Sequence, residues 1–170
     1  MQRKTFTQTL LALAAGTLIF PLAAQAQTTK LTLGHGAAPG NPRHEAAVKF
    51  AEVLKAKSGG RIEVQVAPSA QLGDDAAMVT ALRTGALDMS ANSQGAVANA
   101  VPEYAAFGMP FLFSTAGQAF KVLDGPLGKE LSDKSSEKGL IVLGYWDNGI
   151  RHMTNSKRAI TKVEDMKGLK

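Results

Sequence analysis

The sequence predicts an α/β fold in which a parallel-rich sheet is flanked by helices. Short segments with an apolar residue at every second position alternate with segments whose apolar residues recur at helical spacing. Strands that alternate with helices form βαβ units, so we expect parallel strands joined by right-handed crossovers. No stretch rich in Pro, Gly or Ser divides the chain into two independent domains.

The N-terminus has the pattern of a signal peptide. Arg3 and Lys4 form a short basic region, and an apolar stretch from Leu10 to Leu22 follows it. This stretch is shorter than the ~20 residues that a membrane-spanning helix needs. An Ala-Gln-Ala motif ending at Ala26 puts small residues where a signal peptidase cleaves. We therefore expect residues 1–26 to be removed and the product to be periplasmic.

Residues typical of strand and helix ends identify the first strand and the first helix after the signal peptide. Leu31 to Gly34 alternates in polarity and is expected to be a strand. Asn41 is suited to cap a helix that begins at Pro42, where the missing N–H costs nothing. Gly59 and its neighbouring glycine end that helix, because glycine accepts the left-handed cap conformation.

A second strand–helix–strand unit follows. Ile62 to Val66 alternates in polarity up to Pro68, as a strand does. The Gly-Asp pair ending at Asp74 begins a helix, and Gly85 ends it. Ala86 to Ala91 is then expected to be the third strand.

The remaining elements are expected to be mainly helical. The periodicity predicts a short helix over 96–100, amphipathic helices over 116–123 and 127–138, and a buried strand over 140–145. An apolar loop bracketed by Pro102 and Pro110 separates the first two helices.

The loops that follow the first three strands are the predicted binding edge. They cover 36–40, 67–75 and 92–95. In open α/β sheets, ligands bind beyond the carboxyl ends of the strands, so we expect these loops to converge.

Composition excludes several kinds of site. The chain has no cysteine, which excludes disulfides, thiolate metal sites and a lipid anchor on cysteine. Without Arg3 and Lys4, 17 basic residues face 14 acidic ones, a net charge of +3. The basic residues are scattered, so we expect no nucleic-acid surface, and a mild positive charge suits an anionic ligand. The three histidines lack metal-ligand spacing, and we expect neither a metal nor a cofactor.

Five spaced motifs, taken together, resemble a known receptor family. They are Pro-Ser-Ala-Gln-Leu-Gly-Asp at 68–74, Thr-Gly-Ala-Leu-Asp-Met at 84–89, Pro-Phe-Leu-Phe at 110–113, Asn-Gly-Ile-Arg at 148–151 and Asp-Met-Lys-Gly-Leu-Lys at 165–170. In this order they resemble the DctP-like solute-binding proteins of TRAP transporters, and the resemblance covers 30–170, nearly the whole mature chain.

The resemblance implies a periplasmic-binding-protein-like fold of two lobes. Residues 27–148 would form the N-terminal α/β lobe, and 149–170 would begin the crossover to a second lobe that is largely missing here. The implied function is that of a monomeric receptor that captures an organic acid anion and delivers it to the subunits of a TRAP-type permease. The anion would be a C4-dicarboxylate or a sugar acid. In the family a second arginine follows two residues after Lys170, so we expect this chain to lack half of the pocket and to bind poorly.

The resemblance also implies which residues contact the ligand. Arg151 matches an arginine close to the ligand, and its planar guanidinium would pair with a carboxylate. The other residues that we expect near the ligand follow strands or begin helices, and they are His35, Asp75, Asn92, Ser93, Gln94, Trp146 and Asn148. Turn chemistry would also account for Asn92 and Ser93. A first-turn acid favoured by the helix dipole would account for Asp75, and core or inter-lobe packing would account for Trp146.

Two other functions remain open on the sequence. Ala-Asn-Ser-Gln-Gly at 91–95 is close to a nucleophile elbow, so a secreted α/β hydrolase would use Ser93 with Asp147 and His152. The first glycine of that motif is alanine here, which weighs against the enzyme. A non-transporting lobe that binds a protein partner would instead expose an apolar patch where the second lobe should sit.

Overall fold

The computed structural model describes residues 27–149 and 153–169. Its three strands are β1 (Thr29–His35), β2 (Ile62–Ala67) and β3 (Met89–Ala91). They form one parallel sheet in the order β2-β1-β3, with Leu33 of β1 paired to both Val66 and Met89. The predicted parallel α/β fold is therefore confirmed, although β3 is shorter than the predicted 86–91.

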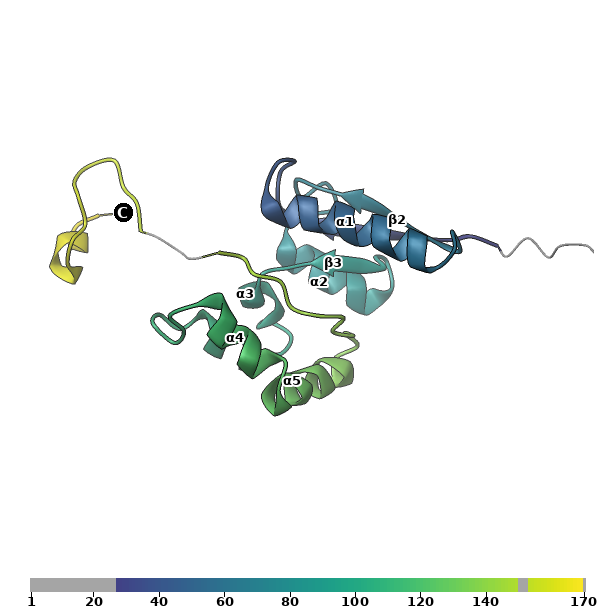
Figure 1. The fold of residues 1–170 in the computed structure, drawn as a ribbon. Coiled ribbons are helices and arrows are strands. Elements are labelled where there is room, and N and C mark those ends of the chain that lie inside the picture. Colours follow the sequence, from purple (N-terminus) through teal and green to yellow (C-terminus); the bar gives the residue numbers. More distant parts are fainter. Residues whose placement is uncertain (1–26, 150–152, 170) are drawn as a thin grey trace, which may run out of the picture.

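Helices α1 (Pro42–Lys57) and α2 (Asp75–Thr84) cover opposite faces of the sheet (Figure 1). Successive side chains of a strand point to opposite faces. Gly34 faces α2 so closely that a Cβ atom there would lie 2.7 Å from Met78 Sδ. The next residue, His35, contacts His44 of α1. The glycine at position 34 leaves the room that the Met78 side chain of α2 occupies.

The helix boundaries follow the capping chemistry of the sequence. Asn41 Oδ1 accepts a hydrogen bond from Arg43 N at the start of α1, with Pro42 as the first helical residue. At the end of α2, Gly85 adopts the left-handed conformation with a φ of 74°. The expected start of α1 and end of α2 are confirmed.

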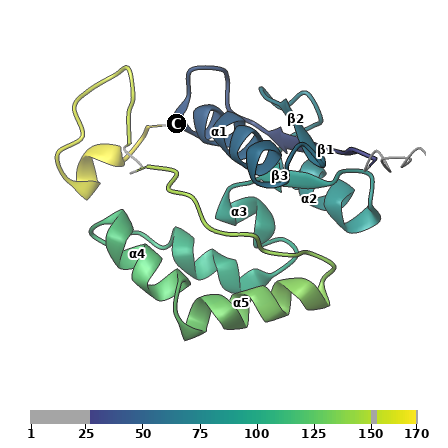
Figure 2. The same cartoon turned by 45° about the vertical axis from the view of Figure 1, so that its right-hand side comes forward.

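A second layer of helices lies beside the sheet (Figure 2). It consists of α3 (Gln94–Val97), the 3-10 helix η1 (Pro102–Gly108), α4 (Ala116–Leu123) and α5 (Pro126–Glu137). Its core holds Val101, Tyr104 and Leu131, each no more than 5% exposed. Tyr104 also hydrogen-bonds Ser135 and Tyr145 at 3.2 Å each, and burial together with Tyr104 raises the pKa of Tyr145.

The predicted strand over 140–145 is wrong. The chain from 140 to 149 has no strand structure, and Ile141 and Leu143 are 82% and 72% exposed. Alternating apolar residues make a strand only when a neighbouring strand satisfies their backbone groups. In the described sheet this segment pairs with no strand, and the side chains of Ile141 and Leu143 remain in solvent.

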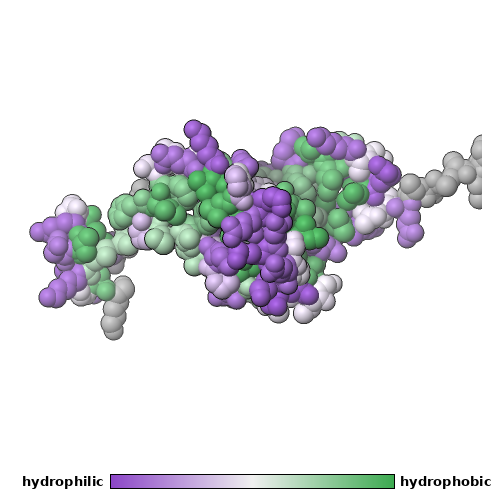
Figure 3. Space-filling view, turned by 90° about the horizontal axis from the view of Figure 1, so that it is seen from below, coloured by the Kyte–Doolittle hydropathy of each residue, from purple (hydrophilic) through white to green (hydrophobic). Residues whose placement is uncertain are grey.

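Two stretches of the described chain each expose more than one large apolar side chain. Met109, Phe111 and Leu112 belong to the loop after η1, and Ile141 and Leu143 belong to the extended segment. On the face in Figure 3, apolar surface flanks a strongly hydrophilic band.

Residues 153–169 form a short local structure of their own. Within it, η2 (Val163–Met166) is capped by Asp165, whose carboxylate accepts hydrogen bonds from Thr161 and Lys162. These bonds hold the pKa of Asp165 below its ordinary value, those from Thr161 most strongly. Among the helices of the described residues, none has the length and apolar character to cross a membrane.

Candidate functional site

The loops that follow β1, β2 and β3 meet at the carboxyl edge of the sheet, as the sequence predicts. Ser69 N donates to Ala37 O at 2.9 Å, and Ala70 N donates to His35 O at 3.1 Å. These bonds tie the loop after β2 to the loop after β1. A third contact, between Asp75 and Ser93, brings in the loop after β3.

Asp75 is the centre of this edge. Its Oδ2 accepts hydrogen bonds from Ser93 N at 2.9 Å and from Ser93 Oγ at 2.8 Å. Asp74 takes the capping role for α2 by accepting from Ala77 N, which leaves Asp75 to reach across to the neighbouring loop. Gly36 lies against the other oxygen, since a Cβ there would be 3.3 Å from Asp75 Oδ1. A side chain at position 36 would crowd that oxygen.

Arg43 is the site residue that the sequence analysis missed. Its Nη2 donates to Asn148 Oδ1 at 2.6 Å, and its Nη1 lies 3.9 Å from Asp75 Oδ2. The side chains of Arg43 and Asp75 are only 19% and 21% exposed. A cation in the first turn of a helix opposes the helix dipole, and that departure from the usual pattern could have drawn attention to Arg43.

His35 lies buried at the end of β1 and contacts a second histidine. Its Nδ1 accepts from Ala37 N at 3.1 Å, and its Nε2 is 3.3 Å from His44 Nδ1. Because Nδ1 accepts a hydrogen bond, a neutral His35 carries its proton on Nε2 and donates to His44. Burial, followed by the charges of His44 and Arg43, holds the pKa of His35 below the ordinary 6.5.

This shift predicts that acid weakens the fold. The unfolded chain protonates His35 near pH 6.5, whereas the folded chain resists protonation. The contribution to stability is therefore present above pH 6.5 and lost as the pH falls below it. We expect the free energy of unfolding in urea to decrease on acidification through this window, and His35→Gln to flatten the decrease. An equal slope in the variant would contradict the assignment.

Asn92 and Gln94 occupy the same loop as Ser93 but make other contacts. Asn92 Nδ2 donates to Ser90 Oγ at 2.6 Å, while its buried Oδ1 has no hydrogen-bond partner among the described residues. Gln94 begins α3, and its amide Nε2 would lie 3.2 Å from a Cβ at Gly108. Asn92 thus has a buried acceptor without a hydrogen-bond partner among the described residues, whereas the Gln94 amide lies beside η1.

Of the expected site residues in the extended segment after α5, one joins the carboxyl edge and another packs elsewhere. Asn148 joins the edge through its bond with Arg43. Trp146 instead packs on Phe50 of α1, with ring centroids 6.4 Å apart, and is 43% exposed. Together with Val53 and other side chains of α1 it lines an apolar groove. This placement favours the packing role for Trp146. Arg151, the expected carboxylate ligand, lies outside the described residues.

The residues proposed for a hydrolase are not assembled in the described part of the chain. Ser93 Oγ donates to the Asp75 carboxylate rather than to a histidine. Asp147 Oδ1 accepts from Gly149 N, a local turn contact. His152 lies outside the described residues. Ser93 therefore serves to fix Asp75 in place.

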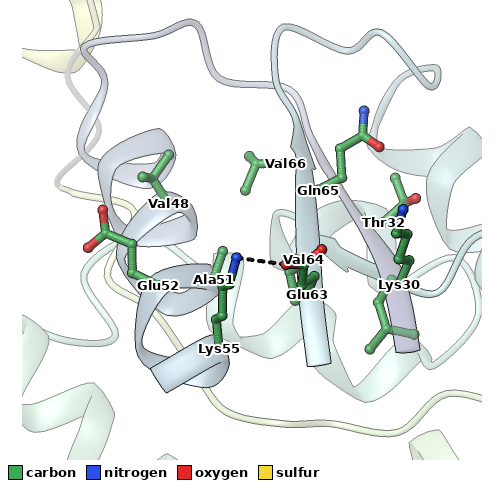
Figure 4. A pocket seen from close by; sticks show the side chains of 11 residues that line it. Lys30, Thr32, Val48, Ala51, Glu52, Lys55, Glu63, Val64, Gln65 and Val66 are labelled. Atoms are coloured by element: carbon green, nitrogen blue, oxygen red, sulfur yellow. Dashed lines mark ion pairs between the residues drawn. The ribbon is translucent and has the colours of Figure 1, made fainter. Parts of the chain in front are cut away.

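A hollow lies away from this edge, between α1 and the edge strand β2 (Figure 4). It measures about 500 Å³ and is walled by Val48, Val64 and Val66, and Lys55 Nζ lies 2.6 Å from Glu63 Oε1 beside it. The paired side chains of Lys55 and Glu63 are 59% and 40% exposed. Among the described residues, no cluster of three potential metal ligands occurs.

Comparison with known proteins decides the family. The family model described as "Bacterial extracellular solute-binding protein, family 7" (DctP) matches residues 33–170. The chain belongs to this family. Members of family 7 are solute-binding receptors rather than enzymes. The resemblance expected from the five sequence motifs is confirmed.

Family 7 relatives cover most of this chain but extend well beyond it. An uncharacterised protein, y4mM of Sinorhizobium fredii, is 56% identical over 84% of this chain and 26% of its own length. The 2,3-diketo-L-gulonate-binding periplasmic protein YiaO of Escherichia coli is 35% identical over 82% of this chain and 43% of its own length. The chain thus spans less than half the length of these relatives.

A solved family 7 structure confirms the fold. The sugar acid binding protein DctPAm of Advenella mimigardefordensis, in complex with galactonate, matches with a TM-score of 0.79 and 38% identity. The match covers 82% of this chain and 45% of that protein. The α/β lobe described above is therefore one lobe of the family architecture.

Proposed function

We propose that this chain is the ligand-binding lobe of a periplasmic receptor that captures an organic acid anion and delivers it to a TRAP-type permease. The observation that carries the proposal is the convergence of Asp75, Ser93, Arg43 and Asn148 at the carboxyl edge of the sheet. Ligands of open α/β sheets bind at such an edge. YiaO is named as a 2,3-diketo-L-gulonate-binding protein, and DctPAm is named as a sugar acid binding protein. Both names support an organic acid as the ligand of this chain.

The proposed mechanism is capture without a catalytic step. An acid anion bound at this edge would be enclosed by a second lobe, and its binding would shift the population from open to closed. In this proposal residues 1–26 are a signal peptide cleaved after Ala26, residues 27–148 are the first lobe, and 149–170 begin the crossover. Arg151 would pair with the carboxylate, and the polar edge would hold the rest of the ligand.

The test is a thermal-shift comparison of galactonate with galactitol, which share a polyol chain but differ in the carboxylate. Ligand that binds only the folded state stabilises it by RT ln(1 + [L]/Kd), which at about ten times Kd is about 1.4 kcal/mol. We expect galactonate to raise the melting temperature by several degrees and galactitol to leave it unchanged. Equal shifts from both would contradict carboxylate recognition, and no shift from any organic acid in a panel would contradict the receptor.

A non-transporting lobe that binds a protein partner is the second candidate. The exposed Phe111, Ile141 and Leu143 favour it, because large apolar side chains left in solvent are candidates for a protein contact. This candidate predicts no response to any organic acid. The hydrolase predicts turnover of a generic ester that Ser93→Ala abolishes, and we expect no turnover at all.

A further inference from the structure

We propose that Asn148 and Gly149 form a self-modifying site, at which the Gly149 nitrogen displaces ammonia from the Asn148 side chain with the help of Asp147 and Arg43. The product is an aspartyl or isoaspartyl residue at position 148. This chemistry belongs to the chain itself and requires neither the ligand nor the permease of the proposed function.

Asn148 is the only asparagine in the sequence that precedes a glycine. Glycine has no side chain to obstruct its own nitrogen, and its backbone adopts conformations closed to other residues, so this pair can close a five-membered ring. Gly149 has a left-handed φ of 77°. Both residues are exposed, and residues 140–149 lie in no helix or strand. Neither burial nor regular structure therefore opposes ring closure or keeps water from the product.

Asp147 is placed to take the proton of the attacking nitrogen. Its Oδ1 accepts a hydrogen bond from Gly149 N at 2.9 Å. The N–H proton has to leave as the nitrogen bonds to Asn148 Cγ, and a general base must lie within hydrogen-bond distance of the proton that it removes. The Asp147 carboxylate meets that requirement, and it can return the proton to Asn148 Nδ2 as that nitrogen departs.

Arg43 is placed to stabilise the oxygen that gains charge. Its Nη2 donates to Asn148 Oδ1 at 2.6 Å. Addition of the Gly149 nitrogen to Cγ turns this carbonyl oxygen into an oxyanion, and a charged donor already bonded to it favours that state. The Arg43 side chain is only 19% exposed, so water screens its charge less than that of a surface arginine. Arg43 lies 105 positions away in α1, so only the folded chain has this arrangement.

The reaction consumes one water molecule and releases one molecule of ammonia. Gly149 N forms a bond to Asn148 Cγ, and the bond from Cγ to Nδ2 breaks as ammonia leaves with the proton from Asp147. Water then opens the resulting five-membered imide. Attack at Cγ gives an aspartyl residue, whereas attack at the backbone carbonyl carbon of position 148 gives an isoaspartyl residue. Either product carries a carboxylate where a neutral amide faced Arg43, which adds one negative charge to the carboxyl edge of the sheet.

The experiment compares the rate of this modification in the folded and the unfolded protein at the same neutral pH. Trypsin releases residues 139–151 as one peptide, in which mass spectrometry measures the fraction that has lost ammonia and gained water. Guanidinium chloride separates Arg43 from Asn148 but leaves the Asn-Gly sequence intact. We expect the folded protein to react roughly tenfold faster, less than the 10²–10⁴-fold that a general base supplies in an active site. A folded protein that reacts no faster than the unfolded chain would overturn the proposal.

Two variants assign the chemistry to its residues. Asp147→Asn keeps an acceptor for Gly149 N but removes the base, and Arg43→Gln removes the charged donor. We expect each to slow the folded protein to the rate of the unfolded chain, and neither to change the rate in guanidinium chloride. Glu45→Gln, in the exposed first turn of α1, also removes one carboxylate and should react like the wild type. Circular dichroism shows whether each variant is folded. An unchanged rate in either folded variant, Asp147→Asn or Arg43→Gln, would overturn the proposed chemistry.

Discussion

Replacing Gly128 by alanine is expected to cost the fold roughly 3 kcal/mol, the upper part of the range for overpacking a core. A Cβ atom at this position in α5 would lie 1.6 Å from Leu123 O and 2.5 Å from Leu123 C. Both are backbone atoms at the end of α4, so no side-chain rotation relieves the clash. One turn further on, Leu131 fills the core with Val101 and Tyr104, and separating α5 from α4 would disturb that packing. Urea unfolding followed by circular dichroism measures the loss.

The matched control is Gly117→Ala in the neighbouring helix α4. There the nearest atom to an added Cβ is Thr115 Oγ1 at 4.0 Å, an ordinary contact. Alanine is favoured over glycine inside a helix, so this variant should be unchanged or more stable by roughly 0.5–1 kcal/mol. If both variants unfolded at the same urea concentration as the wild type, the close approach of α4 and α5 would be refuted.

Replacing Arg151 by lysine is expected to weaken binding of an organic acid at least tenfold, which corresponds to about 1.4 kcal/mol. The proposal rests on the family motif Asn-Gly-Ile-Arg at 148–151. A guanidinium presents a planar pair of donors to a carboxylate, whereas an ammonium keeps the charge but loses the paired geometry. The Kd for galactonate, from an NMR titration of the ¹⁵N-labelled protein, is the quantity to compare.

Arg83→Lys provides the same chemical change away from the proposed site. Arg83 is exposed at the end of α2, and its Nε donates to Lys138 O. We expect its affinity for galactonate to equal that of the wild type. An Arg151→Lys variant that also bound with unchanged affinity would remove Arg151 from the site.

Local chemistry made much of the fold predictable. Asn41 and Pro42 determine the start of α1, and Gly85 determines the end of α2, because these residues favour one backbone conformation with little help from the rest of the chain. The alternation from Ile62 to Val66 similarly identifies β2.

Features that depend on contacts distant in sequence were harder to predict. The segment 140–145 has a strand pattern, yet a strand requires a partner that the described sheet does not provide. Within the site, the convergence of the loops at the carboxyl edge followed from parallel topology. The particular bonds did not, because Arg43 meets Asn148 across 105 positions of sequence. No local pattern specifies such a pair.

The most direct test of the central claim is to locate a bound acid on the lobe. Isotope-filtered NOE spectra with ¹³C-labelled galactonate report which protein protons lie within about 5 Å of the ligand. We predict NOEs to the side chains of His44, Asp75 and Ser93, at the carboxyl edge of the sheet. NOEs confined instead to the methyl groups of Val48, Val64 and Val66, which wall the hollow in Figure 4, would contradict this claim.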